Sequence, residues 1–152
     1  MRIAISNDHA ATELKETLLS HLQEKATKQN LIITDLGSKG EKGQDYPHYA
    51  KIVSQAIAAG EQDFGILLCG TGAGMCMAAN KIKGIRAVVC SDPYTARLSR
   101  EHNNAQVLCI GARVTGSELA KAITDAFLSA QFEGGRHQER VATFMAYENL
   151  KD

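Results

Sequence analysis

The chain has 152 residues, 44% of them hydrophobic, and its 17 basic and 17 acidic side chains leave no net charge. A chain of this length is expected to form one domain, 1–152, that buries about two-thirds of its unfolded surface. The scattered basic residues argue against nucleic-acid or anionic-membrane binding, and the lack of a run of about 20 apolar residues argues against a membrane span.

Apolar runs that favour strands alternate along the chain with segments of helical periodicity. The N-terminus enters the first strand too early for a secretory signal, so we expect a cytoplasmic protein. Strands are predicted over 2–7, 31–36, 64–68, 85–90 and 107–110. Helices are predicted from about 11 to 28, from 46 to 60, from 73, from 93 to about 102, around 119–127, and from about 135. This alternation predicts a three-layer α/β/α Rossmann-like sandwich with a five-stranded parallel sheet.

Residues 64–81 hold the most informative stretch, an apolar strand followed by the glycine turn Gly70-Thr71-Gly72-Ala73-Gly74 and a helix of small residues. Glycines let the backbone approach a ligand, and the helix start adds a positive dipole end, so an anion or an oxyanion fits there. Cys69, directly before the turn, is favoured as a thiolate and is a candidate base or nucleophile. The alternative is a plain strand-to-helix turn beside a buried thiol, since the turn matches neither the P-loop nor the dinucleotide fingerprint.

The four cysteines, at 69, 76, 90 and 109, show no C-x-x-C spacing and are expected to be reduced. The five histidines form no close cluster with them in sequence, so no metal site is expected. The last helix, from about 135, leaves one face available to a partner subunit.

Parallel sheets bind ligands beyond the carboxyl ends of their strands, which brings Asp8, His9, Cys69 and Arg113 to one rim. His102 ends a helix and is expected at the opposite edge of its own subunit. It reaches a rim site only if two subunits pair across that site. As a lone histidine, it is also consistent with an ordinary capping residue. Asp8 likewise suits a helix N-cap, and Tyr46 a turn aromatic.

Arg136 and Arg140 lie four residues apart at the start of the last helix, where the helix dipole disfavours cations. A bound phosphate removes that penalty, and the two guanidinium groups share a helix face. The alternative is a solvated basic turn paired with Glu133 and Glu139.

Several of these segments together resemble the type B ribose-5-phosphate isomerase family, which also holds allose- and galactose-6-phosphate isomerases. The resemblance covers nearly the whole chain and rests on Asp8-His9-Ala10, Asp45-Tyr46-Pro47, Cys69 to Gly74, Ala79-Asn80-Lys81, Gly84-Ile85-Arg86-Ala87, Ser99 to Asn103, Gly111-Ala112-Arg113 and Glu133 to His137. It implies a cofactor-independent aldose–ketose isomerase of ribose 5-phosphate and ribulose 5-phosphate, in a homodimer or tetramer with shared active sites.

The resemblance also implies roles for individual residues. Cys69 matches the proton-transfer base, Thr71 and the backbone of Gly70, Gly72, Ala73 and Gly74 match the cradle for the enediolate oxygens, and His102 matches the residue that opens the sugar ring with help from Asp8. The substrate-binding set comprises Asp8, His9, Tyr46, Asn103, Arg113, Arg136 and Arg140.

Ala11 and the pair Ser6-Asn7 depart from the glycines usual in these relatives and leave the length of the substrate open. The alternative functions are isomerisation of a 6-phosphohexose, such as allose or galactose 6-phosphate, and non-catalytic sensing of a sugar phosphate.

Overall fold

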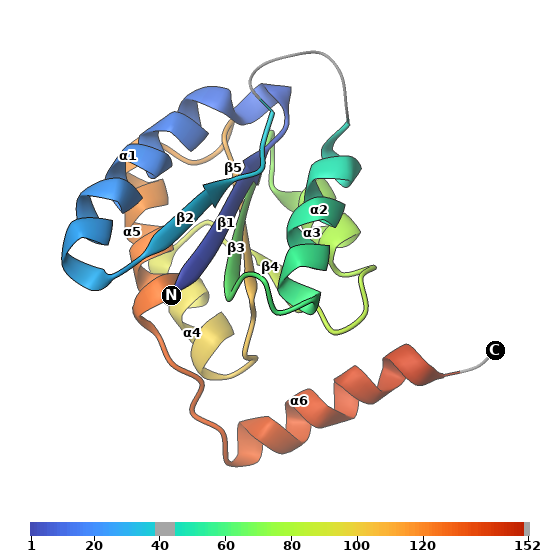
Figure 1. The fold of residues 1–152 in the computed structure, drawn as a ribbon. Helices are drawn as coiled ribbons and strands as arrows, with labels where there is room; N and C mark the ends of the chain where they lie inside the picture. The colour runs from blue at the N-terminus through green and yellow to red at the C-terminus, as the bar shows by residue number, and fades with distance from the viewer. Residues whose placement is uncertain (39–44, 151–152) are drawn as a thin grey trace.

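A computed structural model describes residues 1–38 and 45–150. Five parallel strands form one sheet in the order β2-β1-β3-β5-β4 (Figure 1). Their bounds are β1 Arg2–Asn7, β2 Ile32–Asp35, β3 Phe64–Cys69, β4 Ala87–Val89 and β5 Val107–Gly111. β1 lies inside the sheet, with β2 on one side and β3, β5 and β4 on the other. This parallel order confirms the predicted Rossmann-like arrangement.

The central strands carry apolar side chains on both faces of the sheet, so helices cover both faces. On one face lie α1 (Thr12–Gln29), α4 (Pro93–Glu101) and α5 (Ser117–Ser129), and on the other lie α2 (Tyr46–Ala58) and α3 (Ala73–Ala79) (Figure 1). The first core includes Ile3, Ile5, Ile66, Leu68, Ile110, Leu18 and Phe127, and the second includes Ala4, Leu67, Val107, Val53 and Met75. The three-layer sandwich is therefore confirmed.

Several predicted boundaries differ from the structure by a few residues. The first helical segment begins with a 3-10 turn, His9–Ala11, before α1 starts at Thr12. The strand predicted over 85–90 is paired only over Ala87–Val89, because the Arg86 amide bonds to the Gln106 side chain instead of a strand neighbour. The strand predicted over 31–36 is shorter at both ends. Between the strand predicted over 31–36 and the helix predicted from 46, residues 39–44 lie outside the described part of the chain.

The last helix, α6 (Arg136–Ala146), extends away from the sandwich instead of packing on the sheet (Figure 1). A 3-10 turn, Tyr147–Asn149, follows it. The Glu148 carboxylate accepts a hydrogen bond from the Gly84 amide at 2.9 Å, so the C-terminal end of this segment returns to the turn before β4. A hollow of about 390 Å³, lined by Arg86, Phe144 and Met145 among others, separates α6 from the sandwich. Among the described residues, no helix is both long enough and apolar enough to cross a membrane.

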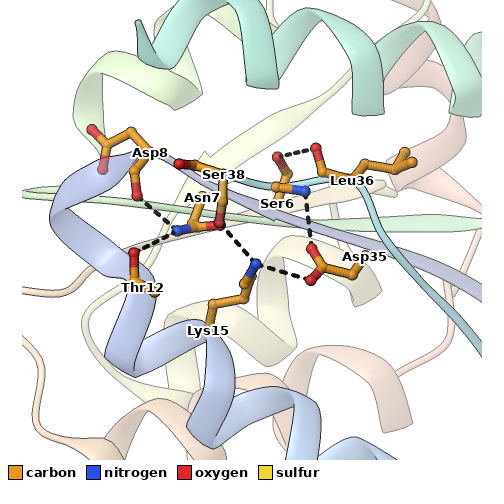
Figure 2. Close-up of polar contacts among 9 residues, drawn as sticks. Ser6, Asn7, Asp8, Thr12, Lys15, Asp35, Leu36 and Ser38 are labelled. Atoms are coloured by element: carbon orange, nitrogen blue, oxygen red, sulfur yellow. Dashed lines mark hydrogen bonds and ion pairs between the residues drawn. The ribbon is translucent and has the colours of Figure 1, made fainter. Parts of the chain in front are cut away.

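A buried lysine ties the first helix to the end of β2. Lys15 is only 2% exposed, and its ammonium group donates to the Asp35 carboxylate at 2.9 Å and to the Ser38 carbonyl at 3.0 Å (Figure 2). A buried ammonium is tolerated only where such acceptors replace its water shell. The network therefore fixes the chain that leaves β2 against the N-terminal turns of α1.

We expect Lys15→Met to lower the free energy of unfolding by about 1–3 kcal/mol, because two hydrogen bonds from a charged donor are lost and the Ser38 carbonyl loses its buried donor. Urea denaturation followed by circular dichroism measures the change. Lys51→Met, at an exposed position on α2, is the matched control and should change stability by less than about 0.5 kcal/mol. Equal stability of the two variants would contradict the structural role of Lys15.

Candidate functional site

The end of β3 and the glycine turn place a thiol against a backbone amide. Cys69 is 5% exposed, and its Sγ accepts a hydrogen bond from the Gly72 N–H at 3.2 Å. Gly72 has a positive φ of 81°, and a Cβ there would lie 2.9 Å from a Val89 methyl group and 3.1 Å from the Ile110 backbone. Only glycine satisfies both constraints. The sulfur therefore faces the turn and is held there by an amide donor.

Hydrogen bonds join the glycine turn to the exit of β5. The Ala112 amide donates to the Cys69 carbonyl at 2.8 Å, and the Arg113 amide donates to the Gly70 carbonyl at 3.0 Å. The Arg113 side chain lies over Gly70, 3.5 Å from the position that a Cβ would occupy there. This brings a guanidinium group over the residue that follows Cys69, on the rim where Arg113 is predicted.

Tyr46 closes the other side of the turn. It is the first residue of α2 and is 40% exposed, and its ring lies so close to Gly74 that a Cβ there would be 2.8 Å from it. Thr71 and Ala73 are exposed at the same turn. The structure therefore brings together the predicted residues Tyr46, Cys69 to Gly74 and Arg113.

The end of β1 carries Asp8 to the same rim. The Asp8 amide donates to the Leu68 carbonyl at 3.1 Å, one residue before the catalytic candidate Cys69. The Asp8 carboxylate caps the following 3-10 turn by accepting from the Ala10 amide at 2.9 Å, so the predicted N-cap role is confirmed. His9 is exposed and lines a polar hollow of about 620 Å³ between the starts of α1 and α5.

The unusual residues before Asp8 brace this turn. The Asn7 side chain donates to the Asp8 carbonyl at 2.7 Å, and the Ser6 hydroxyl donates to the Leu36 carbonyl at 3.1 Å (Figure 2). Ala11 is 1% exposed and packs in the core beneath α1. All three side chains point into the protein, so they support the rim and do not line it.

A second group of predicted residues lies at the far end of the chain's fold. His102 follows α4, Asn103 is exposed next to it, and Arg136 and Arg140 are exposed on α6. Both helices lie toward the amino-terminal ends of the strands, opposite the rim (Figure 1). Within one chain, Arg136 and Arg140 therefore do not converge with Arg113, and the edge expected for His102 is confirmed.

His102 stacks face to face on His137, with ring centroids 4.1 Å apart and an interplanar angle of 5°. One Glu133 carboxylate oxygen lies 3.8 Å from Nε2 of His102 and 3.6 Å from Nε2 of His137. Burial lowers the pKa of His137, and the nearby His102 and Arg136 lower it further. Among the described residues, this trio brings one possible ligand atom from each side chain within 4.8 Å of the others, but the parallel rings do not point both imidazole nitrogens at one position.

The four cysteines are free thiols with different surroundings. Burial raises the pKa of Cys90 to about 12 and holds the pKa of Cys109 well above its usual range. A hydrogen bond with Cys109 lowers the pKa of Cys76, on α3. Cys90 and Cys109 therefore remain protonated at neutral pH and are excluded as bases.

Sequence reasoning misses the structural roles of two residues. Asn7 supports the turn at Asp8, and the signal that could have shown this is an Asn directly before an Asp at a strand end, which favours side-chain capping of a turn. Glu133 lies next to His102, and no signal in the sequence shows this, because 31 residues separate the two along the chain.

Comparisons with known proteins agree on one family. The profile of the Ribose/Galactose Isomerase family matches residues 3–144. Ribose-5-phosphate isomerase B of Escherichia coli is 51% identical over 99% of both chains. D-Erythrulose-4-phosphate isomerase of Pectobacterium atrosepticum is 47% identical over 98% of this chain and 96% of its own. The crystal structure of ribose-5-phosphate isomerase B from Mycoplasma genitalium with bound ribulose 5-phosphate superposes with a TM-score of 0.90, at 40% identity, covering 99% of this chain and 97% of that one.

Proposed function

The chain belongs to the ribose/galactose isomerase family, and from that membership we infer that it interconverts D-ribose 5-phosphate and D-ribulose 5-phosphate. The observation that carries the assignment to this chain's own residues is the Cys69 sulfur held against the Gly72 amide at 3.2 Å, between Asp8 and Arg113 on one rim. A non-catalytic sensor needs the arginines and the glycine turn but no thiol at that position.

Aldose–ketose isomerisation moves one proton from C2 to C1 while the carbonyl moves from C1 to C2. In our proposal the Cys69 thiolate takes the C2 proton, and the electron pair forms the C1–C2 double bond of a cis-enediolate with the charge passing to O1. The hydroxyl proton moves from O2 to O1, and the thiol returns its proton to C1 as the carbonyl forms at C2. The Gly72 hydrogen bond holds the sulfur in position at the turn. No step requires a redox partner or a cofactor.

The enediolate places negative charge on two oxygens next to the sulfur. Backbone amides of the turn from Gly70 to Gly74, with the exposed Thr71 hydroxyl, are the donors that we assign to these oxygens. A fixed donor at a developing oxyanion is worth about 3 kcal/mol, and the bonds that hold the turn to β5 keep the donors from reorganising.

Ring opening and phosphate binding require the groups at the opposite edge, so we propose a homodimer, or a tetramer of two dimers, with active sites shared between subunits. His102 of one subunit then opens the furanose ring with Asp8 of the other. The substrate-binding set combines His9, Tyr46 and Arg113 from one chain with three residues of the second, Asn103, Arg136 and Arg140. The separation of α6 from its own sandwich supports this arrangement, because such a helix is free to reach a second copy (Figure 1).

Replacing the thiol tests the base assignment. Cys69→Ala should lower kcat by about 10²- to 10⁴-fold, the usual contribution of a positioned base, with little change in KM. Steady-state kinetics with ribose 5-phosphate measure the loss, and circular dichroism verifies the fold. Cys76→Ala, which removes a half-buried thiol from α3, is the control and should keep most of the activity. Undiminished turnover of Cys69→Ala would contradict the assignment.

Mixing two inactive variants tests the shared site. Cys69→Ala and His102→Ala homodimers each lack one group in both sites, but a heterodimer contains one site with both groups intact. Subunit exchange of equal amounts should therefore restore about a quarter of the wild-type activity, because half of the dimers are mixed and each has one working site. Activity that stays at the level of the separate variants after verified exchange would mean that Cys69 and His102 act in the same subunit.

A panel of phosphorylated sugars tests the substrate. The buried positions of Ser6, Asn7 and Ala11 leave the phosphate end of the rim unobstructed by these side chains, and we expect kcat/KM to be highest for ribose 5-phosphate. Allose 6-phosphate and galactose 6-phosphate represent the hexose alternative, and erythrulose 4-phosphate represents the tetrose relative. A higher kcat/KM for any of these would reassign the substrate, while absence of deuterium exchange at C2 with all of them would indicate a sensor.

A further inference from the structure

Two histidines from separate segments form a parallel stack at the end of the fold opposite the rim. His102 is the C-cap of α4, and His137 lies in the first turn of α6. Their ring centroids are 4.1 Å apart, and the ring planes differ by 5°. A ring packed face to face on a fixed neighbour cannot turn out of its plane without losing that contact. The orientation of one ring therefore depends on the other.

His137 is the fixed member of the pair. Its side chain is buried, with the whole residue 6% exposed. The Glu133 amide donates to the Glu101 carbonyl at 3.0 Å, which joins the connection before α6 to the end of α4. Gly134 and Gly135 then turn the chain with positive φ values of 66° and 53°, a conformation that favours glycine. The backbone thus brings the His137 ring against the end of α4.

The His102 ring has few contacts besides this stack. Its side chain is 34% exposed, and the Glu133 carboxylate lies 3.8 Å from its Nε2, beyond hydrogen-bond distance. Within residues 1–38 and 45–150, neither ring nitrogen of His102 has a hydrogen-bond partner. The stack on His137 is therefore the contact that sets the orientation of the His102 ring.

The surrounding charges keep one ring of the pair neutral. Two protonated imidazoles with centroids 4.1 Å apart repel each other. Burial lowers the pKa of His137, and His102 and Arg136 lower it further. The Glu133 carboxylate opposes this effect, and Arg140 adds to it. His137 is therefore the neutral ring at neutral pH, and it packs on His102 without repelling a proton there.

We propose that His137 is a positioning residue, which holds the His102 ring in the orientation needed to open the sugar ring. This inference rests on the proposed function, in which His102 acts with Asp8 of the other subunit. In the ring-opening step the C1–O4 bond breaks, His102 gives a proton to O4, and the C1 hydroxyl gives its proton to Asp8, so that C1 becomes the aldehyde. His137 acts only through His102 and exchanges no proton with the substrate.

Steady-state kinetics of two substitutions test the stack. His137→Ala removes the ring and should lower kcat/KM for ribose 5-phosphate about 10- to 100-fold, since a displacement of about 1 Å at a reacting group has effects of this size. His137→Phe keeps a flat ring without an ionisable nitrogen and should recover most of that loss. Gln138→Ala, at the exposed neighbouring position, is the control and should behave like the wild type. Equal losses in His137→Ala and His137→Phe would overturn the role of the stack.

Hydrogen exchange at C1 of ribulose 5-phosphate separates ring opening from general damage. This sugar is open-chain because its C5 oxygen carries the phosphate, so Cys69 can take the C1 proton without ring opening. In deuterium oxide, His137→Ala should exchange the C1 hydrogen at close to the wild-type rate, as measured by proton NMR. Exchange that falls as far as isomerisation would overturn the proposal. A wild type with neither exchange nor isomerisation would contradict the proposed function itself, whereas normal isomerisation by His137→Ala contradicts only the positioning role.

Proton NMR of the wild type tests the stack without any substitution at position 137. The ring protons of His102 are identified by the signals that disappear in His102→Ala. They should lie upfield of those of an unstacked histidine in a short peptide, because they lie over the face of the His137 ring. Signals at the unstacked position would overturn the proposal, whether or not the His137 variants fold.

Discussion

The close approach of β3 and β5 at their carboxyl ends is the constraint on which the rest of the site depends. Gly111 pairs with Cys69, and a Cβ on Gly111 would lie 2.6 Å from the backbone of Thr71. The next two amides of the β5 exit bond to the Cys69 and Gly70 carbonyls. One pair of strands thus fixes the sulfur, its amide donor and the Arg113 side chain with respect to one another, before any substrate binds.

The opposite flank of the rim is held by polar side chains inside the protein. Asn7 fixes the carbonyl of Asp8, while Lys15 joins the α1 turn to Asp35 and Ser38 (Figure 2). Ser6 and Asn7, before Asp8, are fully buried and face inward, so these polar side chains do not block the rim. The buried Lys15 ammonium specifies one arrangement, because leaving it without its acceptors is costly.

Much of this fold follows from the sequence, because apolar runs and helical periodicity report directly on burial. Those signals fail where a side chain replaces a strand neighbour as hydrogen-bond partner, as Gln106 does at Arg86. They also do not predict that Glu133 lies next to His102 and His137, because the three residues come from different segments. One half of the candidate site could be predicted from the sequence, because a cysteine directly before a glycine turn at a strand end indicates an anion or oxyanion site. The four-residue spacing of Arg136 and Arg140 indicated an anion site, with a solvated basic turn as the alternative. The role of His102 came from family resemblance alone, because a site divided between opposite ends of a chain leaves no spacing that joins its two halves.

The outlying position of α6 has a consequence for how the enzyme responds to dilution. Under the shared-site proposal, the groups assigned to ring opening and phosphate binding lie at one end of the fold and the thiol at the other, so a solitary chain would hold two incomplete half-sites. Association with a second copy is then part of catalysis itself, and specific activity falls with protein concentration below the dissociation constant of the dimer. Scarcity of the protein alone would thus slow sugar-phosphate turnover more than proportionally.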